Sequence, residues 1–136
     1  MSSENRSVAI DEELVSMEEN LAAARALVGL ALLRPAMTRV YYAVFHAARA
    51  LLFAEGLEPK SDEGVQHLLS LHYVKPGRLA PAWNRVYSRL QKFREEADHG
   101  SGFVLDREGL DEELQAAADF CEQARLLLGI SRTRTC

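Results

Sequence analysis

The sequence has little cysteine and no long uninterrupted apolar run. Its two cysteines, Cys121 and Cys136, are too few and too far apart for a disulfide framework or a cysteine-ligated metal cluster. Residues 1–19 lack the basic and apolar regions of a signal peptide. The apolar stretch at residues 21–33 contains Arg25 and is too short to cross a bilayer. We therefore expect a cytoplasmic protein with reduced thiols and no membrane partner.

Motifs for cofactors and metal ions are also missing. The sequence contains no GxGxxG, Walker, HExxH or paired CxxC motif and no EF-hand loop. His67 and His72 are five residues apart, which places them roughly 140° apart around a helix and makes them a poor metal pair. Because the net charge is −4, the whole molecule is not a generic polyanion binder. We expect no metal and no other cofactor, and any nucleic-acid role requires a local basic patch.

What the sequence does contain is helical periodicity. Hydrophobic residues make up 48% and charged residues 26%, which is ordinary for one globular domain. Apolar residues recur at intervals of three and four between breaks marked by glycine and proline, and no stretch alternates as a half-buried strand would. The pattern predicts an all-α, antiparallel up-down bundle of four long helices and one short helix. The expected helices span residues 11–33, 35–55, 62–73, 78–98 and 106–129, and residues 1–10 and 131–136 are expected to be disordered.

The fourth expected helix carries a basic row on one flank. Six Lys and Arg residues and no Asp or Glu occur from Lys75 to Arg94, in a chain that is acidic overall. Since phosphate contacts need only well-spaced cations, such a row is typical of a surface that faces RNA or another phosphate ligand. The alternative is a solvated charged flank. The row consists of Arg78, Arg85, Arg89 and Lys92.

The other flank of the same helix ends in residues that could catalyse a reaction. Arg94 lies at the edge of the apolar stripe, and Asp98 and His99 come where the helix should end. A helix C-terminus favours a nearby cation, and Asp98 could orient the His99 ring. Such a group could perform general acid–base work on a phosphodiester. The alternative is that His99 simply caps the helix.

The second expected helix has a mixed aromatic and basic row opposite its main core stripe. Its members recur at intervals of three and four, and a row of this kind is unusual on a solvent-exposed face. It could be a dimer seam, a ligand wall or a contact with a fifth helix, and a seam or packing role is favoured over catalysis. The row consists of Arg39, Tyr42, His46, Arg49 and Phe53.

Residues 38–52, TRVYYAVFHAARALL, resemble the signature S-R-x-Y-Y-A-x-F-H-A-x-x-A-L-L of a small bacterial and archaeal HEPN subfamily. Three later segments agree in order and spacing: KSDEGVQ at residues 60–66, HYVK at 72–75 and LQKFREEAD at 90–98. The resemblance extends over roughly residues 10–130, which is nearly the whole chain.

The resemblance implies a helical bundle that pairs as a symmetric homodimer, with the ends of the fourth helices at a shared cleft. HEPN toxins cleave RNA without a metal through an R-x(4–6)-H motif and are often encoded beside a minimal nucleotidyltransferase antitoxin. Arg94 and His99 fit R-x4-H. By similarity, His99 would assist attack by the 2′-OH or protonate the leaving oxygen, and Arg94 would stabilise the pentavalent phosphate.

The chain departs from the pattern of those toxins at several positions. Ser101 stands where the best-known nucleotidyltransferase-paired toxins have a tyrosine that the partner modifies with AMP. Glu95 and Glu96 follow the arginine of the motif, and close relatives often carry tyrosine in place of His99. A non-catalytic HEPN module that binds a nucleotide or a nucleotidyltransferase partner is therefore the alternative to a ribonuclease, and a purely structural dimer is a third reading.

Overall fold

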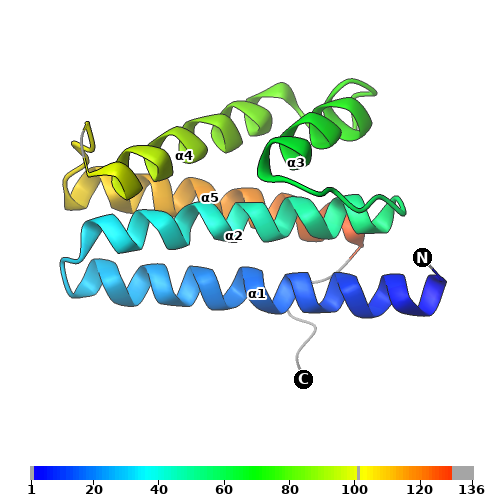
Figure 1. Ribbon diagram of the computed structural model, residues 1–136, viewed down its shortest axis with the longest axis horizontal. Coiled ribbons are helices and arrows are strands. Elements are labelled where there is room, and N and C mark those ends of the chain that lie inside the picture. Colours follow the sequence, from blue (N-terminus) through cyan, green and yellow to red (C-terminus); the bar gives the residue numbers. More distant parts are fainter. Residues whose placement is uncertain (1, 101, 130–136) are drawn as a thin grey trace.

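The computed structural model of the chain describes residues 2–100 and 102–129, and every regular element in these two ranges is helical (Figure 1). α1 and α2 lie side by side and antiparallel. α4 and α5 are also antiparallel to each other, and both pack against α2. The predicted all-α bundle of four long helices and one short helix is confirmed. Its elements are α1 (Ser3–Gly29), α2 (Leu33–Ala54), α3 (Asp62–Leu69), the π-helical turn η1 (Ser70–Val74), α4 (Pro81–His99) and α5 (Arg107–Leu128).

The start of α1 corrects the prediction for the N-terminal residues. The helix begins at Ser3 instead of near residue 11, because the Ser2 hydroxyl accepts a hydrogen bond of 3.1 Å from the backbone N–H of Asn5. Residues 3–10 therefore belong to the bundle and are not disordered. The expected disorder of residues 131–136, together with Cys136 and Ser101, lies outside the described residues.

The remaining helix ends follow ordinary capping chemistry. Ser61 and Asp106 cap the first turns of α3 and α5 with their side-chain oxygens. Gly100 and Gly129 end α4 and α5 in the left-handed region, each with φ of 73°. α4 begins at Pro81 instead of residue 78, because the chain first closes a turn in which the N–H of Arg78 donates to the Tyr73 carbonyl.

α2 is the central helix, as its broad apolar surface predicted. It packs against α1, α3, α4 and α5. Much of the surface it presents is alanine, which lets neighbouring helices approach closely. The fully buried alanines of α2 are Ala36, Ala43, Ala47, Ala48 and Ala50.

An aromatic cluster joins α2 to α4 and α5. The Tyr41 and Tyr87 hydroxyls lie 3.3 Å apart, and Phe120 packs against both Tyr87 and Trp83. Burial raises the pKa of Tyr41 to about 12, so its hydroxyl stays protonated at neutral pH. Burial also raises the pKa of the Cys121 thiol, which lies in the same core.

No helix within residues 2–100 and 102–129 is long and apolar enough to cross a membrane.

Replacing Ala47 with Leu should destabilise the bundle by about 1–3 kcal/mol, because the larger side chain overfills a tightly packed position on α2. Urea unfolding followed by circular dichroism measures this. The matched control is Ala22→Leu on the exposed side of α1, which should change the stability by less than about 0.5 kcal/mol. Equal effects of the two substitutions would show that α2 is not tightly packed.

Candidate functional site at the end of α4

Arg94 is held firmly in the last two turns of α4. Its side chain is 17% exposed, and Nη1 donates a hydrogen bond of 3.1 Å to Asp98 Oδ2. The guanidinium carbon lies 4.8 Å from the centre of the Tyr41 ring and 6.0 Å from that of Tyr42. A carboxylate of α3 approaches from another side, with Asp62 Oδ2 4.0 Å from Nη2. The cation is therefore fixed by groups from α2, α3 and α4.

The charge of Arg94 is maintained despite this partial burial. Burial by itself lowers the pKa of the guanidinium, but the hydrogen bond to Asp98 and nearby groups outweigh it and raise the pKa above its ordinary value. Within the part of the chain that the structure describes, Nε of Arg94 is buried and has no hydrogen-bond partner. The Nε–H group of Arg94 is thus an unused hydrogen-bond donor.

Two contacts tie the end of α4 to the start of α2. The Thr38 hydroxyl donates a hydrogen bond of 3.0 Å to Asp98 Oδ1. Arg34 donates one of 2.9 Å to the carbonyl oxygen of Gly100, the residue that ends α4. Asp98 therefore uses one oxygen for Thr38 and the other for Arg94. The segment that carries Asp98 and Gly100 is anchored to α2 at two points.

His99 is the last residue of α4, and its side chain is exposed. Across residues 2–100 and 102–129, no side chain forms a hydrogen bond or an ion pair with it. Asp98, which was expected to orient the His99 ring, is instead the partner of Arg94 and Thr38. In addition, Arg94 and His99 are five residues apart and project roughly 140° apart around α4. Within one chain, the side chains of Arg94 and His99 therefore do not point toward the same position.

The predicted basic row of four cations is only partly correct. Arg78 lies in the turn before α4, where it pairs with Glu55 at 2.5 Å and stacks on the Tyr73 ring. Arg89 lies on α4 but binds both carboxylate oxygens of Glu113 on α5, at 2.8 and 3.0 Å. Both cations are thus neutralised by carboxylates from other elements.

Arg85 and Lys92 are the remaining members of the row. Both are exposed on α4, and neither has an ion-pair partner among the described residues. They are seven residues apart, which places them on one side of the helix about two turns apart. These two cations are the ones available to a phosphate ligand.

Three polar members of the mixed row on α2 contact side chains of α1, which gives these members a packing role. Arg39 donates to Asn20 Oδ1 at 2.8 Å. Further along α2, His46 Nδ1 lies 2.9 Å from Glu13 Oε1, and Arg49 Nε donates to the same oxygen at 2.8 Å. Glu13 and Asn20 were missed in the sequence because they look like ordinary polar positions of an amphipathic helix.

No three His, Cys, Asp or Glu side chains within the described ranges are grouped as a metal ion would require.

Glu13→Gln should destabilise the protein by about 1 kcal/mol at pH 7, because it removes the charge shared by His46 and Arg49. Burial alone raises the pKa of the Glu13 carboxyl, but hydrogen bonds from His46 and Arg49 leave it below the ordinary value. This stabilisation is therefore present above the ordinary pKa of a glutamate and is lost as the pH falls through the lowered one.

Urea unfolding at pH 7 and pH 3 tests the pH dependence. The wild-type protein should lose more stability on acidification than the Glu13→Gln variant does. Glu12→Gln, at an exposed position of α1, is the control and should behave like the wild type. An unchanged acid response in Glu13→Gln would contradict the assigned role.

Comparisons with known proteins identify the family. A model described as the HEPN domain matches residues 16–131. The chain is 39% identical over 82 residues to "Putative toxin MJ0605" of Methanocaldococcus jannaschii, covering 60% of this chain and 61% of that protein. It is 35% identical over 80 residues to a UPF0332 protein of Pyrococcus horikoshii, covering 59% and 54%. It is 28% identical over 96 residues to a UPF0332 protein of Thermotoga maritima, covering 71% and 73%.

The alignments with the first two relatives thus span less than two thirds of the length of those proteins. The family match is broader, because it takes in all of α2, α3, α4 and α5 and much of α1. It also contains the helix end formed by Arg94, Asp98 and His99. The chain belongs to the HEPN domain family.

Proposed function

We propose that the protein is the toxin of a toxin–antitoxin system and acts as a metal-independent endoribonuclease, with Arg94 and His99 as catalytic residues. The observation that carries the proposal is the pre-oriented Arg94, which is charged, largely sheltered and held by Asp98 and Tyr41, five residues before the exposed His99. The relative from M. jannaschii whose name is "Putative toxin MJ0605" supports the toxin part of the proposal.

The chemistry uses the 2′-OH of RNA. That oxygen attacks the adjacent phosphorus, the bond from phosphorus to the 5′-oxygen breaks, and the products carry a 2′,3′-cyclic phosphate and a 5′-hydroxyl. A proton must leave the 2′-OH and another must reach the 5′-oxygen, and in this proposal the exposed His99 transfers one or both of them. Arg94 stabilises the negative charge that develops on the phosphate oxygens.

The proposed ribonuclease is a homodimer. In a single chain Arg94 and His99 project from different sides of α4, so one copy does not surround a phosphodiester with both groups. A two-fold axis that pairs the ends of two α4 helices brings two sets of these residues together at one cleft. Arg34 and Thr38 fix this end of α4 on α2, so that a partner meets a pre-formed surface.

RNA is expected to reach the cleft along Arg85 and Lys92. These exposed cations lie on the helix that ends at His99. Arg78 and Arg89 contribute less to RNA binding than the sequence predicted, because Glu55 and Glu113 already neutralise them. The overall acidic charge of the chain makes this narrow basic strip the favoured path for a polyanion.

A second candidate is a non-catalytic HEPN module that binds a nucleotide or a minimal nucleotidyltransferase partner. One observation favours it. Asp98 is hydrogen-bonded to Arg94 and Thr38, and no other side chain among the described residues orients the His99 ring. A phosphate group could still displace Asp98 from Arg94 and be bound without being cleaved.

Expression of the wild-type chain without an antitoxin should arrest growth of the host cell, and Arg94→Ala and His99→Ala should each relieve the arrest. Loss of general acid–base or electrostatic assistance should lower RNA cleavage about 10²–10⁴-fold. Growth curves measure the arrest, and cleavage of a labelled RNA by the purified variants measures the rate.

Controls separate the catalytic residues from other residues of the same type. Arg25→Ala and His67→Ala remove an exposed arginine and an exposed histidine elsewhere and should leave the arrest intact. Circular dichroism confirms that each variant is folded. If His99→Ala is as toxic as the wild type, the ribonuclease proposal fails and the binding module is favoured.

RNA binding should depend on salt through Arg85 and Lys92. In a His99→Ala background, which prevents cleavage, the slope of log affinity against log salt should shrink by roughly 0.7 for each of the two residues replaced by alanine. Arg89→Ala should change the slope less, because Glu113 already holds that cation. Fluorescence anisotropy with a single-stranded RNA measures the slopes, and equal slopes for all variants would exclude the proposed path.

A further inference from the structure

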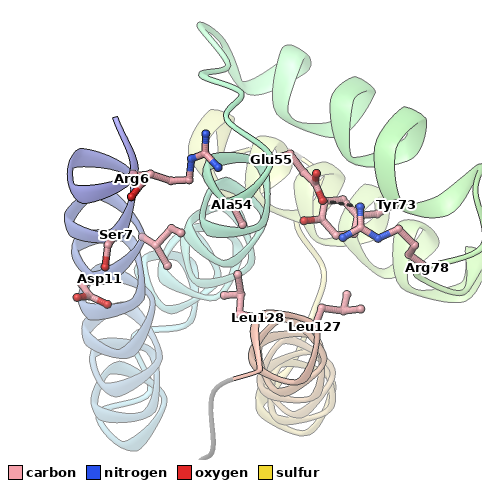
Figure 2. A pocket seen from close by; sticks show the side chains of 11 residues that line it. Arg6, Ser7, Asp11, Ala54, Glu55, Tyr73, Arg78, Leu127 and Leu128 are labelled. Atoms are coloured by element: carbon pink, nitrogen blue, oxygen red, sulfur yellow. Dashed lines mark ion pairs between the residues drawn. The ribbon is translucent and has the colours of Figure 1, made fainter. Parts of the chain in front are cut away.

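A pocket lies at the end of the bundle where α1 begins, opposite the end of α4 (Figures 1 and 2). Its volume is about 460 Å³, which lies within the usual range for small-molecule sites. The first turns of α1, the end of α2 and the end of α5 surround it, and the turn before α4 closes one side. Its lining combines a few charged groups with an apolar floor.

α1 contributes two serines, an arginine and an isoleucine to this pocket. Ser3, Arg6, Ser7 and Ile10 all line it, and their spacing of three, one and three residues places them on one face of the helix. The part of the lining that comes from α1 thus includes two hydroxyls and one guanidinium. Nε of Arg6 is buried and, among the described residues, has no hydrogen-bond partner. A side chain of this kind suits a carboxylate or a phosphate group, which accepts hydrogen bonds from a guanidinium in pairs.

Arg6 lies close to the backbone that ends α2. A Cβ atom on Gly56 would be 3.1 Å from Arg6 Nη2, so the guanidinium packs closely against the backbone there. Gly56 also has φ of 78°, a conformation that other residues rarely adopt. The backbone conformation at Gly56 thus favours glycine at the point where Arg6 packs against the end of α2.

The opposite wall contains an ion pair that is stacked on an aromatic ring. Figure 2 shows the Glu55–Arg78 ion pair above the Tyr73 ring, and the guanidinium carbon of Arg78 lies 4.2 Å from the ring centre. Glu55 is neutralised by Arg78, so it adds little repulsion toward an anion. The other carboxylate of the lining, Asp11, lies about 7.5 Å further along the α1 axis than Arg6, at a rise of about 1.5 Å per residue.

The floor of the pocket is apolar. Ala54 at the end of α2 lies between the two walls, and Leu127 and Leu128 of α5 lie below it in Figure 2. A bare inorganic anion would leave these groups without a partner, whereas a ligand with an apolar body would cover them.

We propose that this pocket binds a small organic anion, in which a carboxylate or phosphate group binds Arg6 with Ser3 and Ser7 and an apolar body covers Ala54, Leu127 and Leu128. This site is separate from the end of α4 and does not rest on the ribonuclease proposal. It gives the protein a second binding function, for a metabolite-sized ligand, at the far end of the bundle.

Phenyl phosphate and benzoate are the probes, each titrated into the ¹⁵N-labelled full-length protein. Saturable chemical-shift changes are expected at the backbone amides of Ser7, Ala54 and Leu127, and the tighter probe identifies the preferred anionic group. Inorganic phosphate should bind at least tenfold more weakly than phenyl phosphate, because it lacks the apolar body. Benzamide, which is neutral, should bind at least tenfold more weakly than benzoate.

Arg6→Gln should weaken binding of the better probe tenfold or more, because a charge-assisted contact is lost. Arg25→Gln makes the same change in net charge on the same helix outside the pocket and should bind like the wild type. Ala54→Leu fills the pocket while keeping Arg6 and should also weaken binding, so the proposal is tested even if Arg6→Gln fails to fold. Absence of saturable shifts with both probes, or equal binding of benzamide and benzoate, would overturn it.

Discussion

The burial of α2 on nearly all sides is the constraint on which the rest of the structure depends. Its alanines let neighbouring helices approach closely, and its larger residues fill the core between α1, α4 and α5. A helix with so little free surface must place its polar residues where neighbouring helices can satisfy them. Arg39, His46 and Arg49 meet side chains of α1, and Thr38 meets Asp98 of α4.

Residues of α2 also hold the side chains and backbone of the candidate active site in position. Tyr41 of α2 provides the ring under Arg94, and Thr38 holds the carboxylate that binds the same arginine. Arg34 fixes the carbonyl of Gly100 just after His99. The segment of α2 that resembles the family signature therefore does two things: it builds the core and it positions the end of α4.

The fold could be predicted from the sequence because helical stripes and capping residues are local signals. The helices expected to begin at residues 62 and 106 begin at Asp62 and Arg107, directly after the capping residues Ser61 and Asp106. Ion pairs between helices could not be predicted, since they depend on how two helices align. Glu113 is 24 residues from Arg89, and neither residue alone indicates that the two carboxylate oxygens face that guanidinium. The prediction that Asp98 orients His99 was wrong for the same reason, because Thr38 is 60 residues away.

The central functional claim is that the end of α4 cleaves RNA by its own side chains. The most direct test is to incubate purified full-length protein with RNA in excess EDTA and to analyse the ends of the products. The account predicts cleavage with 2′,3′-cyclic phosphate and 5′-hydroxyl ends by the wild-type protein, and none by the Arg94→Ala or His99→Ala variant. Intact RNA with the wild-type protein at all concentrations, or equal cleavage by the variants, would contradict it.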